Sequence, residues 1–479
     1  MLRQFFKDSV VYGASGVVAR GISFFLVPFY TRVFTPGDYG IIDLIGIISS
    51  VVGYIFSLEI TQAIARYYPD ADGPESARGY ASTALIFTLT AFSGFLVFGI
   101  AIAEPLARGL SNEELNAGLI RAAGLSIFAN WLMYFVQNQL RWRLEPKSYA
   151  ICSILYSLMA IGLTVALVLG FRVGVIGVFL AQAIAGLTTF ILGMYFSRSS
   201  YRFTFEWKKF KEMVSFSLPL VPSSLGMFML GYADRIAITS MMSIGDLGIF
   251  GIGFRVASIV TLIMGGFQTA ITPLVYSKYK ESDTPSQLAS IFRYFTFAAL
   301  IATAGLTLFS REILVLLTTP SYYAAESVIP PLVASSFLSN MYVFAPGLSI
   351  AKKTKHIAVI NLSGAVLNVG LNYFLVGIWG IVGAACSTLI SSCFIFGAFM
   401  KLSQRYYSVP HNPGLLLKSI ALTVIVSGMG YALDFQSLFV AVAAKSTLLG
   451  LLFFFLMVIG LMRLDEFRLY FGKLRLNMQ

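Results

Sequence analysis

The sequence predicts an all-α polytopic membrane protein with about 14 transmembrane helices: two repeated six-helix lobes followed by two C-terminal helices. Composition is the first reason, since 57% of the 479 residues are hydrophobic and only 12% are charged. A soluble protein of this composition would have too little polar surface to face water. The other reasons are a series of apolar segments with short loops between them, and an internal repeat.

Each apolar segment is long enough to cross a bilayer, which takes ~20 residues in a helix. No loop between the segments is long enough to form a soluble domain. The hydropathy of the chain places the spans at roughly 9–31, 41–65, 79–103, 116–138, 148–170, 173–196, 212–233, 247–272, 289–310, 328–350, 356–376, 378–400, 415–433 and 438–461.

Two short glycine motifs each occur twice. Gly37-Asp38-Tyr39-Gly40 returns as Gly245-Asp246-Leu247-Gly248, and Gly174-Val175-Ile176-Gly177 returns as Gly380-Ile381-Val382-Gly383. The offsets are 208 and 206 residues. We therefore expect two lobes of parallel topology, an arrangement that places a substrate site at their interface. The predicted domains are 1–203, 204–405 and 406–479, the last comprising two additional helices and a cytoplasmic tail.

The formal net charge of +12 is explained by the distribution of basic residues. With the N-terminus in the cytoplasm, 25 of the 34 Lys and Arg residues fall in cytoplasmic segments. Only seven fall outside: Arg32, Arg108, Arg121, Arg172, Arg235, Arg311 and Lys445. This bias predicts that both termini are cytoplasmic, and it accounts for the basic charge without a nucleic-acid partner.

Several kinds of chemistry have no support in the sequence. The three cysteines lie in apolar segments and the two histidines lie beside basic or loop residues, so we expect no metal site. There is no phosphate-binding loop for ATP and no Ser/His/Asp set. A membrane glycosyltransferase or polymerase would ordinarily need a sizeable extramembrane segment. We therefore predict a protein that is not an enzyme and uses no cofactor.

Two arginines lie inside predicted spans. Arg20 is near the middle of the first span, and Arg255 is in the eighth. A mid-bilayer Arg costs roughly 2.5–3.5 kcal/mol on insertion scales, and intramembrane arginines typically mark a substrate path. Both share a helix face with small residues, so we expect them to face a water-filled cavity between helices and not lipid. The alternatives are that Arg20 pairs with a neighbouring helix for packing and that Arg255 extends outward to water.

A second polar face lies near the cytoplasmic end of the second span and contains Glu59, Gln62 and Arg66. A buried carboxyl group can carry a proton, so Glu59 is a candidate for ion coupling. The equal alternative is that Glu59 is a fixed partner of Arg66 or Arg20.

The fourth span carries polar residues at helical spacing, from mid-bilayer to the cytoplasmic mouth. Amide and phenol groups suit sugar hydroxyls, and arginines suit phosphate at the entrance. The alternative is interhelical hydrogen bonding. The candidate entrance and glycan contacts are Asn130, Tyr134, Gln137, Asn138, Arg141 and Arg143. Prolines that interrupt spans, namely Pro28, Pro219 and Pro222, are candidate hinges.

Arg20, the Pro28-Phe29-Tyr30-Thr31-Arg32 exit of the first span and Thr35-Pro36-Gly37-Asp38-Tyr39-Gly40 resemble the N-terminal signature of Wzx-type oligosaccharide flippases. These belong to the multidrug, oligosaccharidyl-lipid and polysaccharide (MOP) exporter superfamily. The resemblance implies an alternating-access flippase that moves undecaprenyl-pyrophosphate-linked oligosaccharide from the cytoplasmic to the outer leaflet of the bacterial inner membrane. It implies a role in polysaccharide, O-antigen or exopolysaccharide biosynthesis.

The resemblance also implies a cationic central cavity, which Arg20 and Arg255 match, and candidate partners in membrane lipids, a glycan polymerase and chain-length machinery. Two other functions stay open. One is an ion-coupled multidrug exporter of the same superfamily, although both arginines would repel cationic drugs. The other is a membrane-embedded polymerase or ligase of a glycan pathway.

Overall fold

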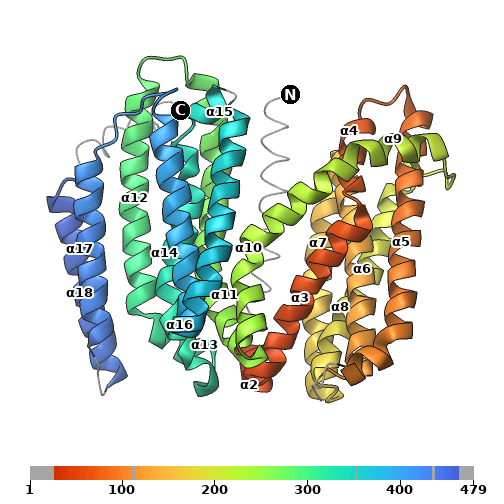
Figure 1. Cartoon of the computed structure of the whole chain (residues 1–479), viewed down its shortest axis with the longest axis horizontal. Coiled ribbons are helices and arrows are strands. Elements are labelled where there is room, and N and C mark those ends of the chain that lie inside the picture. Colours follow the sequence, from red (N-terminus) through yellow and green to blue (C-terminus); the bar gives the residue numbers. More distant parts are fainter. Residues whose placement is uncertain (1–25, 110–114, 352, 434–436, 463–479) are drawn as a thin grey trace. The chain divides into compact units, whose positions relative to one another are not determined.

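The computed structural model describes residues 26–109, 115–351, 353–433 and 437–462 (Figure 1). Within these ranges the chain forms helices and no β-strand. It divides into two compact units, Met1–Tyr232 and Ala233–Gln479. The predicted all-α class is confirmed.

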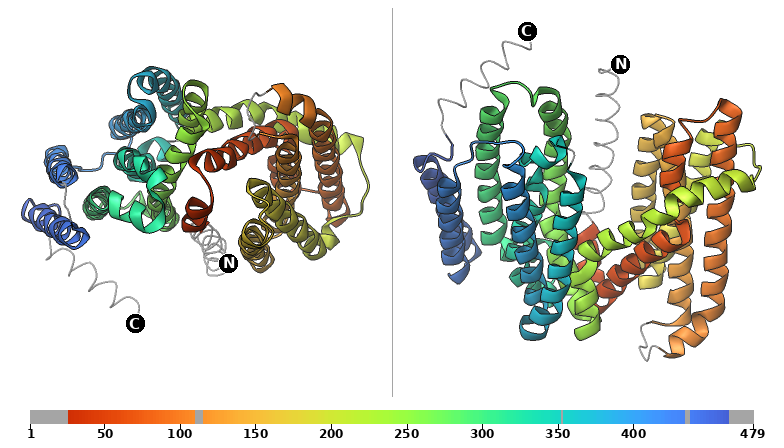
Figure 2. Two further views of the ribbon diagram at one scale, coloured as in Figure 1. Left: turned by 90° about the horizontal axis from the view of Figure 1, so that it is seen from below. Right: turned by 45° about the horizontal axis from the view of Figure 1, so that its top comes forward.

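The first unit contains four helices that pack side by side, α5 to α8 (Figure 2). A π-helical turn, Ala166–Gly170, extends α7, and 3-10 turns follow α8 and α9. The helices are α2 (Leu26–Val33), α3 (Pro36–Ser57), α4 (Ile60–Tyr67), α5 (Pro74–Gly109), α6 (Ala117–Trp142), α7 (Pro146–Val165), α8 (Val175–Ser197), α9 (Trp207–Ser217) and α10 (Val221–Met241), the last of which continues into the second unit.

In the second unit, α14 packs against α11 and α16, and the two last helices lie beside α12 (Figure 2). The segments Pro320–Val328 and Met341–Phe344 are 3-10 helical. The helices are α11 (Ile244–Lys278), α12 (Thr284–Leu308), α13 (Ser310–Leu317), α14 (Ile329–Asn340), α15 (Gly347–Ile350), α16 (Thr354–Ser403), α17 (Pro413–Ala432) and α18 (Leu438–Val458).

Among the described residues, 11 helices are long and apolar enough to cross a membrane, and α9 with α10 makes a twelfth candidate. The 50-residue α16 is more than twice the length of one span, and Gly380 breaks its helical geometry with φ 59° and ψ −136°. It therefore accommodates two predicted spans, 356–376 and 378–400. The first predicted span lies largely outside the described residues. These two facts account for the difference from about 14 spans.

The Gly-Asp motifs begin helices in the same way in both units. The Thr35 hydroxyl accepts from the Asp38 amide at 3.2 Å, and the Asp38 carboxylate accepts from the Thr35 amide at 2.9 Å. Ser243 and Asp246 form the same capping box at the start of α11, with both distances 3.1 Å. Such boxes satisfy two otherwise unpaired amides at a helix start. Asp38 and Asp246 therefore each cap the start of the helix that contains them.

The second repeated motif also has one geometry. Gly174, the N-cap of α8, and Gly380, at the kink within α16, both adopt positive φ, 67° and 59°. Three residues later, a Cβ on Gly177 would lie 3.2 Å from Leu167, and a Cβ on Gly383 would lie 2.0 Å from the Leu375 carbonyl oxygen. The first glycine of each motif permits the turn, and the second permits close packing on the preceding helix.

Helix packing repeats at the same offset of 206 residues. In the first unit, a Cβ on Gly186 of α8 would lie 3.0 Å from the Ala129 Cβ of α6. At the equivalent positions of the second unit, Ser335 of α14 and Ser392 of α16 join their hydroxyls at 2.8 Å. Small residues allow such close helix crossings in membranes. The repeated capping boxes, the repeated positive-φ glycines and the repeated helix crossing all support a duplicated six-helix lobe. The predicted domain boundaries stay predictions.

Two cations differ from their expected positions. Arg235 and Lys445, counted above on the outer side, lie inside α10 and α18 and are only 4% and 6% exposed. The hydropathy pattern ended the seventh span at 233 because two adjacent charges, Asp234 and Arg235, follow it. The helix in fact continues to Met241. Removing both residues from the outer count strengthens the positive-inside bias, and the topology itself stays a prediction.

Candidate functional site

Arg255 is half-buried in α11, eleven residues after Ile244. At 1.5 Å per residue it lies about 16 Å from the start of the helix. This is deeper than hydropathy indicated, because the capping box starts α11 before the apolar run. Arg20, the other predicted member of the cationic cavity, lies outside the described residues. Of the two residues predicted to form the cationic cavity, the structure therefore describes only Arg255, and its binding role stays a prediction.

A buried ion pair beside α11 was missed by sequence reasoning. Asp234 and Arg235 are both 4% exposed, and the Arg235 Nη1 lies 3.5 Å from the Asp234 Oδ1. The guanidinium also stacks on Phe254, 4.1 Å from the ring centroid. A paired charge is the usual form in which a membrane interior holds an arginine. The sequence does show two adjacent charges directly after an apolar run. We interpreted these charges as the start of a loop.

Glu59 lies at a break in the second predicted span. Leu58 and Glu59 both adopt left-handed backbone, with φ 46° and 54°, between α3 and α4. Non-glycine residues rarely do so, and such strain is concentrated at functional sites. Glu59 is 8% exposed, and its carboxylate has no hydrogen-bonding or ion-pairing partner among the described residues.

The other two residues of the Glu59 face point elsewhere. Arg66 pairs with Asp70, four residues later on the surface, and not with Glu59. Gln62 is exposed, and only its backbone amide bonds to the Glu59 carbonyl, at 2.9 Å. The described contacts therefore do not make Glu59 a fixed partner of Arg66, and the coupling role of Glu59 stays a hypothesis.

Polar side chains from three helices lie near Tyr54. Tyr54 of α3 lies within electrostatic range of Glu59, of Tyr134 on α6 and of Tyr232 on α10. Tyr134 is 41% exposed. We call Tyr54, Tyr134, Tyr232 and Glu59 the tyrosine cluster. It unites two predicted site residues, Glu59 and Tyr134, with two that the sequence analysis did not single out.

Aromatic packing holds the tyrosine cluster in place. Trp131 meets Tyr134 edge-on with ring centroids 5.0 Å apart, and its indole donates to the Ser49 carbonyl at 3.0 Å. Gly53 on α3 makes room for the indole, because a Cβ there would overlap it at 1.5 Å. Trp131 therefore fixes α6 against α3, and with it the position of Tyr134.

The amides of α6 bond mainly within the protein. Asn130 accepts from the Tyr156 hydroxyl of α7 at 2.9 Å, and Gln137 donates to the Ser153 hydroxyl at 3.2 Å. Asn138 donates to the Tyr134 carbonyl at 2.9 Å. These contacts match interhelical and local bonding, and any contact with a glycan stays a prediction. Gln139, not singled out before, is 1% exposed, and its amide has no partner among the described residues.

The two predicted entrance arginines lie at the C-terminal end of α6, which the predicted topology places in the cytoplasm. Arg141 stacks over Tyr149, 5.4 Å from the ring centroid. Arg143 donates to Ser199 and Ser200 at 2.8 and 2.9 Å and pairs with Glu145 at 2.6 Å. Arg143 lines a cavity of about 410 Å³ that also includes Arg78, Tyr68 and Trp142. This is a polar notch of the size that small-molecule sites have.

Two of the three predicted hinge prolines lie where regular α-helix is interrupted. Pro219 is inside the 3-10 turn Leu218–Leu220, and Pro222 follows directly at the start of α10. Pro28 lies in α2, where its carbonyl accepts from the Arg32 Nη1 at 2.8 Å. A 3-10 turn within a span is typical of a hinge, and hinge motion at these positions stays a prediction.

We expect Glu59→Gln, which mimics the protonated carboxyl group, to remove the dependence of transport on an imposed proton gradient. Glu104→Gln serves as the control, because Glu104 is an exposed carboxylate paired with Arg121. Transport rates of both variants in proteoliposomes with and without the gradient provide the measurement. Full gradient dependence in Glu59→Gln would remove Glu59 from the coupling role.

Comparison with known protein families and relatives identifies the family of this chain. The model of a family described as polysaccharide biosynthesis protein matches residues 29–327. The chain belongs to this family. A relative from Haemophilus influenzae, "Lsg locus putative protein 1", is 26% identical over 303 residues, covering 61% of this chain and 71% of the relative. One from Haloferax volcanii, "Probable low-salt glycan biosynthesis flippase Agl15", is 22% identical and covers 80% of each chain.

Solved structures show that this polysaccharide biosynthesis protein has the fold of the MOP superfamily. The lipid II flippase MurJ, in an inward closed conformation, matches with a TM-score of 0.74 and 14% identity, covering 94% of this chain and 98% of that one. An inward-facing MATE multidrug transporter matches with a TM-score of 0.64 and 16% identity, covering 81% and 94%. The polysaccharide biosynthesis family expected from the N-terminal motif is confirmed.

Proposed function

We propose that this protein flips a lipid-linked oligosaccharide from the cytoplasmic to the outer leaflet of a bacterial inner membrane, and that the carrier is undecaprenyl pyrophosphate. In this proposal the protein is a transporter that makes and breaks no covalent bond. Family membership supports a role in polysaccharide biosynthesis. The name of the Haloferax relative supports flipping of a glycan intermediate.

The tyrosine cluster is the observation that carries the proposal. A glycan crossing a bilayer needs hydroxyl-bonding groups at membrane depth, where lipid offers none. A tyrosine supplies both a flat apolar face and a hydroxyl group. Tyr54, which lies near Glu59, Tyr134 and Tyr232, brings such groups together from three helices. Such a cluster suits a sugar better than an apolar cargo.

The pyrophosphate of the carrier needs fixed positive charge. Arginine supplies a planar fork of donors that keeps its charge at any relevant pH. We assign this role to Arg255, half-buried about 16 Å along α11, and to Arg20. An inside-negative membrane potential would favour outward movement of the anionic headgroup by ~2.3 kcal/mol per charge per 100 mV.

The test is flipping of a fluorescent undecaprenyl-pyrophosphate-linked oligosaccharide in proteoliposomes. We expect Arg255→Ala to reduce the flipping rate about tenfold, which is the effect of losing one charge-assisted hydrogen bond. The rate of Arg255→Lys should lie between those of the wild-type protein and Arg255→Ala. Arg108→Ala, at an exposed arginine of α5, is the control and should leave the rate unchanged. Failure of the purified wild-type protein to flip the lipid-linked glycan would contradict the proposed function.

The MATE likeness favours one alternative, export of drugs. The same proteoliposomes discriminate the two functions when they are loaded with a cationic drug. We expect no drug transport, because Arg20 and Arg255 repel cations. Drug transport without glycan flipping would replace the proposal. A lengthened glycan after incubation would instead indicate a polymerase.

A further inference from the structure

An exposed aromatic and basic surface extends from the end of α8 into the first turns of α9. Its members are Arg198, Phe203, Phe205, Trp207, Lys208 and Lys211, and we call it the linker surface. Phe203 is 67% exposed, Trp207 59% and Phe205 42%. Large aromatic side chains this exposed, close together and rimmed by charge, mark an interaction site.

The end of α8 places this surface at the boundary of the membrane. Ile184, Ile191 and Tyr195 are exposed along one side of α8, so they form its lipid-facing stripe. Tyr195 ends the stripe, as aromatic residues do at membrane–water interfaces. The Arg198 guanidinium lies over the Tyr195 ring, 4.6 Å from its centroid. The linker surface therefore begins where the hydrocarbon ends.

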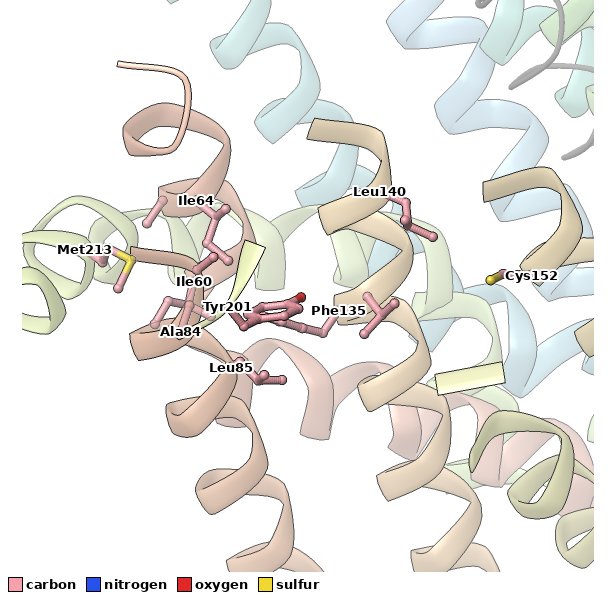
Figure 3. Close-up of a cluster of buried hydrophobic side chains, with 12 residues drawn as sticks. Ile60, Ile64, Ala84, Leu85, Phe135, Leu140, Cys152, Tyr201 and Met213 are labelled. Carbon is pink, nitrogen blue, oxygen red and sulfur yellow. The ribbon is translucent and has the colours of Figure 1, made fainter. Parts of the chain in front are cut away.

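The opposite side of the same segment is fixed to the first unit. Met213 of α9 is fully buried in a hydrophobic cluster with residues of α4 and α5, including Ile60 and Ala84 (Figure 3). Before α9, the Arg202 amide donates to the Ser82 hydroxyl at 2.9 Å and the Glu206 amide to the Thr83 hydroxyl at 3.1 Å. The exposure of the aromatic rings is thus set by packing and hydrogen bonds on the inner side.

Backbone strain accompanies the exposed rings. Phe203 has φ 55°, a left-handed value that is an outlier for a bulky residue. In water neither the strain nor the exposed ring would be compensated. At a bilayer interface, burial of the Phe203, Phe205 and Trp207 rings among lipid chains and headgroups compensates both.

The charges of the segment fall into two sets. Glu206 accepts from Lys209 at 3.2 Å and also pairs with Arg202. Burial works against its ionisation, but these cations outweigh burial and lower the pKa of Glu206. Two cations of the segment are thereby neutralised. Arg198, Lys208 and Lys211 are exposed and have no carboxylate partner among the described residues.

We propose that the linker surface binds anionic phospholipid headgroups of the leaflet at the end of α8. Phe203, Phe205 and Trp207 insert at the boundary between headgroups and chains, while Arg198, Lys208 and Lys211 contact phosphate. The Lys211 ammonium lies over the Trp207 ring, 5.6 Å from its centroid. A basic and an aromatic side chain of the linker surface therefore lie together. The proposal does not depend on the cargo, because it concerns the bilayer and not the transported molecule.

The experiment uses the whole protein in nanodiscs and reads the fluorescence of Trp207 as the difference between the parent protein and Trp207→Phe. Brominated lipid quenches a nearby indole. Two bilayers carry the same fraction of brominated lipid, either as phosphatidylglycerol or as phosphatidylcholine. We expect at least about twofold more quenching by phosphatidylglycerol, since each surface cation favours an anionic leaflet by about fivefold. High salt should reduce the preference.

Lys208→Gln with Lys211→Gln should bring the two quenching values together while Trp207 remains quenched, because the rings stay inserted. The control is Lys401→Gln with Lys418→Gln, at two exposed lysines of α16 and α17, and it should keep the preference. Equal quenching in the parent protein, or a preference unchanged by the Lys208 and Lys211 substitutions, would overturn headgroup binding. Absence of quenching would overturn insertion and favour an acidic protein partner.

Discussion

Arg20→Ala is expected to lower transport per molecule of membrane-inserted protein by at least ~100-fold, since a bidentate Arg–phosphate contact provides two charge-assisted hydrogen bonds of roughly 1.5–3 kcal/mol each. Arg20→Lys should retain part of the activity, because a point charge still attracts phosphate without the fork geometry. The measurement is flipping rate divided by the amount of protein in the membrane fraction.

The matched control for Arg20 is Arg32→Ala. Arg32 belongs to the same N-terminal signature, but it is exposed at the end of α2, where it donates to the Pro28 carbonyl. The Arg32→Ala variant should therefore lose little transport activity. If Arg20 only pairs with a neighbouring helix, alanine should lower protein abundance first, because the partner's charge is then stranded in the membrane. Wild-type specific transport in Arg20→Ala would refute the cationic site.

Lys445→Met is expected to destabilise the packing of the two C-terminal helices by about 3–5 kcal/mol, the usual effect of leaving one partner of a buried ion pair alone. The Lys445 Nζ contacts both Glu312 carboxylate oxygens, at 2.7 and 2.9 Å. The two side chains are only 8% and 15% exposed, and they join α18 to α13. The effect should appear as a lower apparent melting temperature in detergent.

Glu312→Gln combined with Lys445→Met should recover most of that stability, because no charge is then left unpaired. Arg121→Gln provides the contrast. Its ion pair with Glu104 is 3.3 Å long, and both side chains are about half exposed, so its loss should matter by less than ~1 kcal/mol. A double variant as unstable as Lys445→Met would show that the lysine acts by packing and not by its charge.

The sequence by itself determines the features that depend on residues close together in the chain, such as helix starts and turns. The helix starts at Asp38 and Asp246 depend on a hydroxyl three residues earlier, and such capping boxes are local in the chain. The turns at Gly174 and Gly380 depend on positive φ, which glycine adopts without steric cost. The all-α class and the repeat rest on apolar runs and on these motifs, so they needed no knowledge of tertiary contacts.

The contacts of the site came only from the tertiary structure. Tyr134 and Tyr232 are far from Tyr54 in the chain, and only helix packing brings them near it. Apolar runs do not show a break such as Leu58–Glu59, because hydropathy is the same in a straight and a bent helix. Lys445 and Glu312 are 133 residues apart, and the count of basic residues assigned the lysine to the outer side because a single charge does not reveal its partner. Local chemistry therefore determined where helices begin and turn, and long-range packing decided which polar groups share a place within the membrane.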